Sequence, residues 1–409
     1  DQPELIDTAF EVMYDWATAI SFAPEEVSKE APVVIEEWRS SYGTEVQSWQ
    51  QEYSDLYQGT RLVNRLPIGD REIVANATAT QLKSYYQTWY RPDNADFVVV
   101  YPEGAFEALT KIESVFSNWT AEPTPKEDFS VGTVAINGSR FNAVTDSDVT
   151  DQQWQLYIPV KDYGNETALA CEVDYLDQVY TTVLEDRLQR LGEMQGAVII
   201  DAVAQPATFF EGSKHLDVWA TVYEGAEDEA LAALATELHR LSKYGITASE
   251  YDIAKQKLAA ELDNIANWLE GASAADHTDY LMYFISEELP LEDVYSAITE
   301  SKIMYEAISL EKVNRYIAQT VLPNNLAGYF YHPQTMSPSG EQWLNMYAEG
   351  WSRDVSLPVA RVMQAATEEN AFPGEISQEV DLLDSEGLYI WVLENGMSVV
   401  LKPSDLETD

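Results

Sequence analysis

The stretch EAPVVIEEWR, residues 30–39, decides how the first part of the chain folds. It follows residues 23–26 (APEE), in which a proline and two acids are typical of the first turn of a helix. Glu30 and Glu37 are two helical turns apart, so a helix places both carboxylates on one face. The adjacent Glu36 points about 100° away from Glu37. Glutamates on a helix are usually solvated; the alternative is that Glu30 and Glu37 serve one site.

Residues around this stretch recur later in the chain, at a nearly constant spacing of roughly 225 to 230 residues. Phe22, Glu26, Val34 and Glu37 correspond to Ile246, Glu250, Leu258 and Glu261, and Leu82, Tyr85, Tyr86, Pro92 and Asn94 correspond to Val313, Tyr316, Ile317, Pro323 and Asn325. A duplication with so long a period predicts two similar α/β units, since a solenoid has short repeats.

Hydrophobic periodicity predicts the elements of these units. Helices are predicted at 5–20, from about 23, 167–191, 227–244 and 247–269, and strands at 96–101 (DFVVVY), 154–160 (WQLYIPV), 197–203 and 216–222. Residues 336–375 have no sustained period and are interpreted as a linker with one short helix. Near the end of the chain, two apolar runs flank Glu394-Asn395-Gly396, which predicts a hairpin with an Asn-Gly turn.

The charge of the chain excludes two classes of partner. Seventy acidic and 24 basic residues give a net charge of −46, which repels nucleic acid and anionic membrane. No run of 18 apolar residues that could span a membrane occurs. The acids are spread along the chain, which favours a solubilising surface suited to salt; an acidic chamber that attracts basic peptides is the alternative.

Four motifs carry a resemblance to a known family. EAPVVIEEWR is followed by NRLPIG at 64–69 and WYRPDN at 89–94, and LENGMSV at 393–399 precedes Lys402 and Pro403. In this order and at these distances they resemble the pitrilysin/insulinase family of zinc endopeptidases, the inverzincins. The resemblance implies an α+β fold of duplicated pitrilysin-like units, each an antiparallel-rich sheet packed with helices on one face. Residues 1–125 would be the C-terminal part of a truncated catalytic-type unit, 126–335 a second, non-catalytic unit, 336–375 a linker and 376–409 the opening hairpin of a third unit.

The resemblance also implies a zinc site. In that family two histidines of an H-x-x-E-H helix and a glutamate on a later helix hold the metal. Glu37 stands at the position of this glutamate, with Glu36 as its competitor, and Glu30 resembles the glutamate that orients the site. The four histidines, His215, His239, His277 and His332, do not form an H-x-x-E-H frame. We therefore expect the H-x-x-E-H helix upstream of Asp1, no catalytic residue within this chain, and weak zinc binding at most.

The second unit is expected to be inactive. Glu261 repeats Glu37, but Ala254 stands at the position of Glu30. The family also holds substrate with an Arg/Tyr pair from another unit, and the corresponding segment here, residues 187–197, has arginines but no tyrosine. That role is expected in the missing C-terminal half of the polypeptide, which the resemblance makes a partner of this chain.

Two functions remain open. The first is a fragment of a zinc endopeptidase that cleaves peptides or unfolded polypeptides, exported to the periplasm, with zinc bound only in the intact enzyme. The second is a non-catalytic family member that acts as a binding or scaffolding protein. The start at Asp1 without a signal peptide fits a processed, exported product.

Overall fold

The computed structural model describes residues 5–41, 45–65, 68–100, 106–120, 131–132, 134, 136–145, 149–164, 167–208, 213–286, 289, 291, 293–334, 340–359, 375–382 and 387–402. The chain divides into two compact units, residues 1–360 and 361–409. Leu66 and Pro67 of the NRLPIG motif, Tyr101 and Pro403 lie outside the described residues.

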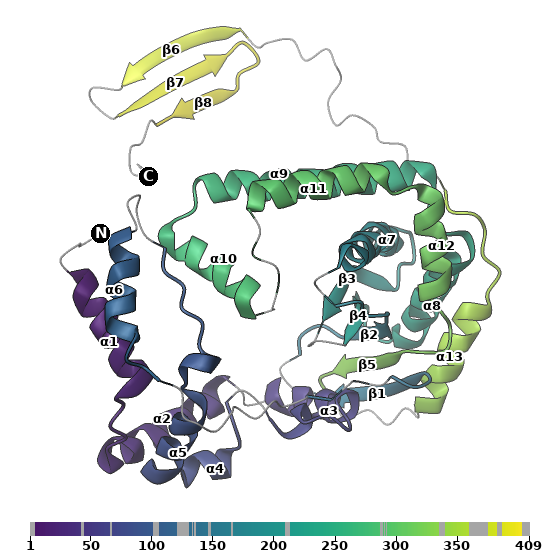
Figure 1. The fold of residues 1–409 in the computed structure, drawn as a ribbon. Coiled ribbons are helices and arrows are strands. Elements are labelled where there is room, and N and C mark those ends of the chain that lie inside the picture. Colours follow the sequence, from purple (N-terminus) through teal and green to yellow (C-terminus); the bar gives the residue numbers. More distant parts are fainter. Residues whose placement is uncertain are drawn as a thin grey trace. The chain divides into compact units, whose positions relative to one another are not determined.

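The first part of the larger unit is helical (Figure 1). It contains α1 (Ile6–Thr18), α2 (Pro24–Ser41), α3 (Glu45–Leu56), η2 (Leu62–Asn64), α4 (Arg71–Ala75), α5 (Ala79–Trp89), η3 (Pro92–Asn94) and α6 (Phe106–Phe116). The helices predicted at 5–20 and from about 23 are confirmed as α1 and α2.

The strand predicted at 96–101 is wrong for residues 96–100, which form no strand. A strand is defined by pairing with another strand, and none is described between residues 5 and 120. Phe97 instead packs against Phe10 and Phe116, with ring centroids 6.2 and 4.8 Å apart. The apolar character of this segment therefore reflects packing between helices.

A five-stranded sheet dominates the rest of the larger unit. Its strands are β1 (Arg140–Thr145), β2 (Gln153–Pro159), β3 (Ile199–Thr208), β4 (Lys214–Val222) and β5 (Ala327–His332), in the order β1-β5-β2-β4-β3. β1 and β5 are parallel and the other pairs are antiparallel, so the sheet is mixed. The strands predicted at 154–160, 197–203 and 216–222 are confirmed as β2, β3 and β4; β1 and β5 were not predicted.

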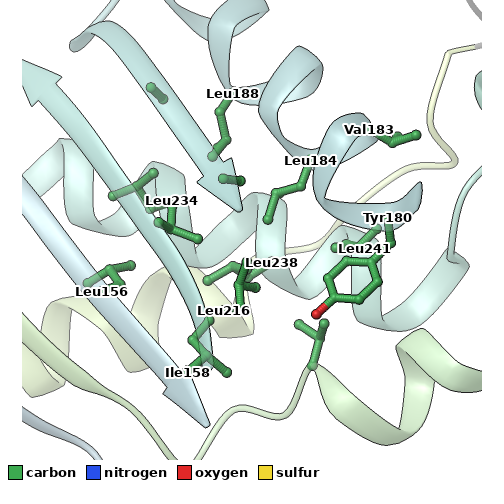
Figure 2. Packing of buried hydrophobic residues seen from close by; sticks show 14 of the residues in the cluster. Leu156, Ile158, Tyr180, Val183, Leu184, Leu188, Leu216, Leu234, Leu238 and Leu241 are labelled. Carbon is green, nitrogen blue, oxygen red and sulfur yellow. The ribbon is translucent and has the colours of Figure 1, made fainter. Parts of the chain in front are cut away.

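Helices cover one face of this sheet. The helices that pack on the strands are α7 (Ala168–Gly192), α8 (Glu227–Tyr244) and α13 (Gly340–Ser352). Helices α9 (Ala248–Glu270) and α12 (Leu310–Thr320) pack on them, α11 (Val294–Ala307) packs on α9, and α10 (Ala274–Ser286) joins α9 to α11 along the chain. Alternate residues of the strands, such as Leu156 and Leu216, point toward α7 and α8 and meet Leu184 and Leu238 in the main core (Figure 2). Thr167 and Thr247 cap the first turns of α7 and α9, as threonine before an apolar-periodic run predicts. The predicted α+β class is confirmed.

The opposite face of the sheet is not bare, contrary to the expectation of helices on one face alone. Tyr157 of β2 and Tyr329 and Tyr331 of β5 point to this side and pack with Leu56 and Tyr57 at the end of α3. These positions alternate with the core-facing ones, because successive side chains of a strand point to opposite faces. A helix from the first part of the chain thus covers part of the second face.

Side chains from helices close both edges of the sheet. The Gln51 amide of α3 donates to the Thr145 carbonyl and accepts from the Thr145 N–H, each at 3.4 Å, at the end of β1. At the other edge, Gln189 of α7 donates to the carbonyl of Ala202 at 3.3 Å. The N–H of Ala204 donates to Glu185, also of α7, at 3.4 Å.

The smaller unit is a three-stranded antiparallel sheet of β6 (Ile376–Leu382), β7 (Leu388–Leu393) and β8 (Ser398–Leu401). The predicted hairpin is confirmed as β7 and β8, and Gly396 in its turn has φ of 87°, which glycine adopts without strain. β6 was not predicted.

Part of the predicted linker is structured. Residues 340–352 form α13, and Trp343 and Tyr347 of this helix are buried in the main core. Residues 360–374 lie outside the described part of the chain. The division into the four predicted segments stays a prediction. Among the described helices, none combines the length and apolarity that crossing a membrane requires.

Candidate functional site

Helix α2 carries the glutamates that the sequence singles out. Glu30 and Glu37 both lie on α2 and both are exposed. Neither carboxylate forms a hydrogen bond or an ion pair with another described residue, whereas Glu36 is paired with Arg39. Of the two adjacent glutamates, Glu37 is therefore the one whose carboxylate is left available for a ligand.

The described residues do not by themselves fit a zinc ion. A catalytic zinc site takes three protein ligands, usually histidines and carboxylates. No group of three or more His, Cys, Asp or Glu side chains with metal-binding geometry occurs in the described part of the chain. The roles of Glu37 and Glu30 stay predictions, and the zinc ligands beyond Glu37 would have to come from elsewhere.

The four histidines lie apart on separate elements. His215 is buried on β4, His239 on α8 stacks on Trp351 with ring centroids 5.5 Å apart, His277 is on α10, and His332 ends β5. The described structure therefore does not bring these histidines together.

Arg187, the first residue of the segment compared with the substrate-holding pair, is buried in a structural ion cluster. Its guanidinium donates to both carboxylate oxygens of Glu250 at 2.8 Å and to the Gly245 carbonyl at 3.0 Å, and approaches Glu237 at 3.4 Å. Burial raises the pKa of Glu250, but the bonds and charge of Arg187 outweigh it and hold this pKa below 4.5. Arg187 therefore fastens α7 to α8 and α9 and is closed to substrate.

On α9, the two positions that correspond in sequence to the glutamates of α2 differ from them. Glu261 is exposed on α9, and Ala254 is fully buried in the main core. A carboxylate at position 254 would face that core, so this helix cannot reproduce the pair of α2.

A second cluster of ionisable groups lies on the tyrosine-bearing face of the sheet, and sequence reasoning missed it. Glu52 of α3 is 3% exposed and accepts hydrogen bonds from the Tyr157 and Tyr331 hydroxyls. Burial, with a contribution from Asp217, raises the pKa of Glu52 to about 7. The only available signal was the alternation of tyrosines in WQLYIPV and AGYFYH, which does not reveal a partner on a distant helix.

Neighbouring groups extend this cluster along α3 and β4. Asp55 of α3 accepts from Arg140 and Tyr329, each at 2.7 Å. Burial raises the pKa of Asp217 on β4 to about 6 and lowers that of His215 to about 4. At neutral pH this face therefore holds an uncharged histidine, His215, and at Glu52 a carboxyl group whose ionisation is opposed by burial.

Comparisons with known proteins agree with this fold. A model described as "Peptidase M16 inactive domain" matches residues 76–258. The chain is 28% identical over 267 residues to the "Probable zinc protease PqqL" of Escherichia coli (strain K12), an alignment that covers 64% of this chain and 28% of that protein.

Two solved structures are similar along most of the chain. The periplasmic protease PqqL from Escherichia coli superposes with a TM-score of 0.76 and 24% identity, covering 99% of this chain and 45% of that one. The first half of the same protease gives a TM-score of 0.74 at 24% identity, covering 88% of this chain and 77% of that structure. The chain thus spans less than half the length of the curated relatives that it matches.

Proposed function

The chain belongs to the M16 (pitrilysin/insulinase) family of peptidases, and from this premise we propose that it forms part of a zinc-dependent endopeptidase that cleaves peptides or unfolded polypeptides. The observation that carries the proposal is the pair of exposed carboxylates on α2. Glu37 contributes one zinc ligand, and Glu30 orients the site from the same helix face. The remaining ligands come from outside residues 1–409, so this chain alone hydrolyses nothing.

A duplication of the M16 unit within this chain is part of the proposal. Helices α5 and α12 each have 11 residues and occupy equivalent positions in the sequence repeat, capped by Thr78 and Ser309. Helix α2 likewise begins at Pro24 and α9 at the equivalent Ala248. These matched starts support units at 1–125 and 126–335, of which the second is non-catalytic.

Partners and location follow from the same premise. We propose peptides as substrates and the other half of a longer polypeptide as the partner that encloses them. The similar protease from Escherichia coli is described as periplasmic, which supports export of this protein.

Zinc content tests the assignment of Glu37. In the longer protein that contains this chain, Glu37→Gln is expected to abolish near-stoichiometric zinc, because an amide is a poor zinc ligand. Glu36→Gln is the matched control: it alters the next residue, which pairs with Arg39, and should leave zinc bound. Zinc retained by Glu37→Gln would refute the assignment.

The activity of residues 1–409 alone provides a second test. Residues 1–409 should not cleave an unstructured peptide with or without added zinc. Chelator-sensitive cleavage by this chain alone would overturn the proposed division of the zinc site.

A non-catalytic binding or scaffolding protein is the second candidate. It is favoured by the match to an inactive-domain model and by the lack of a metal-binding group among the described residues. Its signature is a longer protein without bound zinc, whether residue 37 is glutamate or glutamine.

A further inference from the structure

A buried carboxyl group joins α3 to the sheet. Glu52 lies on the side of α3 that packs on β2 and β5, where the hydroxyls of Tyr157 and Tyr331 both donate to it. Among the described residues, neither lysine nor arginine pairs with Glu52. An ionised carboxylate at such a site is costly, because hydroxyl groups replace only part of the hydration that burial removes.

The groups around Glu52 give an ionised carboxylate little compensation. The titratable and charged residues on the elements packed there are Tyr53, Asp55 and Tyr57 on α3, Arg140 on β1, Tyr157 on β2, His215 and Asp217 on β4, and Tyr329 and Tyr331 on β5. Arg140 is held by Asp55 through a 2.7 Å bond. His215 is uncharged near neutral pH, and Asp217 repels a second negative charge.

We propose that protonation of Glu52 controls the docking of α3 on the sheet. With its proton, the carboxyl group fits between the two tyrosines and α3 stays docked. When the proton is lost, the buried charge favours states in which α3 lifts away and Glu52 reaches water. This device concerns the joint between the first helices and the sheet, and it is independent of the proposed peptidase function.

The direction of the pH effect follows from proton linkage. Glu52 has a pKa of about 7 when docked and an ordinary value of 4.5 when exposed. A raised carboxyl pKa stabilises docking fully below 4.5, and this contribution is lost as pH rises through 7. Docking therefore weakens about tenfold per pH unit inside this window and is constant above it.

His215 and Asp217 act in opposite senses on the acidic side of the window. The pKa of His215 is lowered to about 4 and that of Asp217 is raised to about 6. If undocking exposed both groups, rising pH would favour docking through His215 and oppose it through Asp217. These two contributions end at about pH 6.5, so Glu52 alone sets the dependence from there to pH 7.

Hydrogen exchange of the α3 amides, corrected for intrinsic rates, tests the proposal on the whole chain. Between pH 5 and 8, the opening of α3 in the wild type should increase about 100-fold, with amides of α8 on the other face as the reference. In Glu52→Gln, which has no charge to expose, the increase should be less than about threefold. An equal increase in both proteins, a flat wild-type profile, or an equal rise in α8 would refute the proposal.

Two further variants separate this effect from a general weakening of α3. Asp55→Asn removes the partner of Arg140, so α3 should open more at every pH with the same dependence as the wild type. Asp217→Asn removes the repelling charge and should move the midpoint of the transition to lower pH. If the glutamine variant did not fold, an unchanged midpoint in Asp217→Asn would itself contradict the proposal.

Discussion

The helices of residues 5–120 and the sheet region of residues 136–359 differ in how deeply they bury large apolar side chains. Trp16 on α1 is 65% exposed, whereas Trp154 on β2 is fully buried between Phe141, Phe330 and Trp343. Both regions have amphipathic elements, but only the second has a sheet against which to pack them. Amphipathic sequence therefore provides an apolar face, and burial of that face depends on the surface that meets it.

The largest difference is expected between the two tryptophans. Trp154→Ala should destabilise the chain by about 3 to 5 kcal/mol, because it leaves a cavity and removes the donor to the Glu227 carbonyl. Trp16→Ala should change stability by less than about 0.5 kcal/mol. Denaturant unfolding monitored by circular dichroism measures both. A comparable loss in Trp16→Ala would mean that α1 is covered as fully as the sheet.

Two glutamates at equivalent repeat positions give the next contrast. Glu250→Gln should destabilise by about 3 kcal/mol, because it leaves the buried Arg187 with an incomplete set of acceptors. Glu26→Gln should have no measurable effect, since Glu26 forms an exposed pair with Lys29.

The pH dependence of the Glu250→Gln effect has a definite sign. The pKa of Glu250 is below 4.5 in the folded protein. Its stabilising contribution is therefore present above pH 4.5 and is lost as pH falls through the folded value. The melting temperatures of the wild type and of Glu250→Gln should therefore approach each other as pH falls below 4.5. A difference in melting temperature that grows in acid would contradict this role of Glu250.

A third pair compares α5 with α12 directly. Val313 is fully buried and its repeat equivalent Leu82 is 38% exposed. Val313→Ala should cost about 2 kcal/mol, and Leu82→Ala less than about 1 kcal/mol although it removes a larger side chain. The shift of the midpoint of urea unfolding, with the dependence on urea concentration unchanged, measures the loss of stability in each variant. A larger loss at Leu82 would show that the repeat places its core differently in the two regions.

Salt is expected to have the smallest effect. Bases in the sheet region are shared, as when Lys214 pairs with both Asp174 and Asp177, and 24 bases cannot pair 70 acids. The melting temperature should rise by a few degrees from near zero to several tenths molar sodium chloride, because the Debye length falls below roughly 10 Å above about 0.1 M. A flat or falling melting temperature would favour acids concentrated in a cavity for basic peptides.

Sequence reasoning succeeded where local chemistry determines the element. A proline and two acids at residues 24–26 predicted the start of a helix, and α2 begins at Pro24. The Asn-Gly turn likewise fixed the β7–β8 hairpin. Such elements are specified by neighbouring residues, so their residue types suffice.

Strand 96–101 failed for a different reason. The segment that corresponds to it in the sequence repeat is β5, which pairs with β1 on one side and β2 on the other. No strand is described near residues 96–100 with which this segment could pair in the same way. β1 was missed because its six residues gain their stability from pairing with β5, nearly 190 residues away. Pairing between distant segments is not encoded in local propensity.

The candidate site residues also differ in whether local sequence could predict them. Helical spacing predicted that Glu30 and Glu37 share α2, while their roles at a zinc site stay predictions. The carboxyl group of Glu52 was missed because its environment is created by β2 and β5. Burial of one acid among 70 cannot be inferred before the fold brings those strands to it.

The side chains at the two sheet edges have a consequence for the behaviour of the protein at high concentration. Open edges of β-sheets recruit strands from other molecules and so begin aggregation. Gln51 occupies backbone groups of β1, and Gln189 and Glu185 occupy those of β3. An incoming chain must first displace these side chains before it can pair with β1 at Thr145 or with β3 at Ala202 and Ala204, so the five-stranded sheet is protected at these positions. The same protection depends on the docking of α3 and α7, so states in which either helix is undocked expose these backbone groups again.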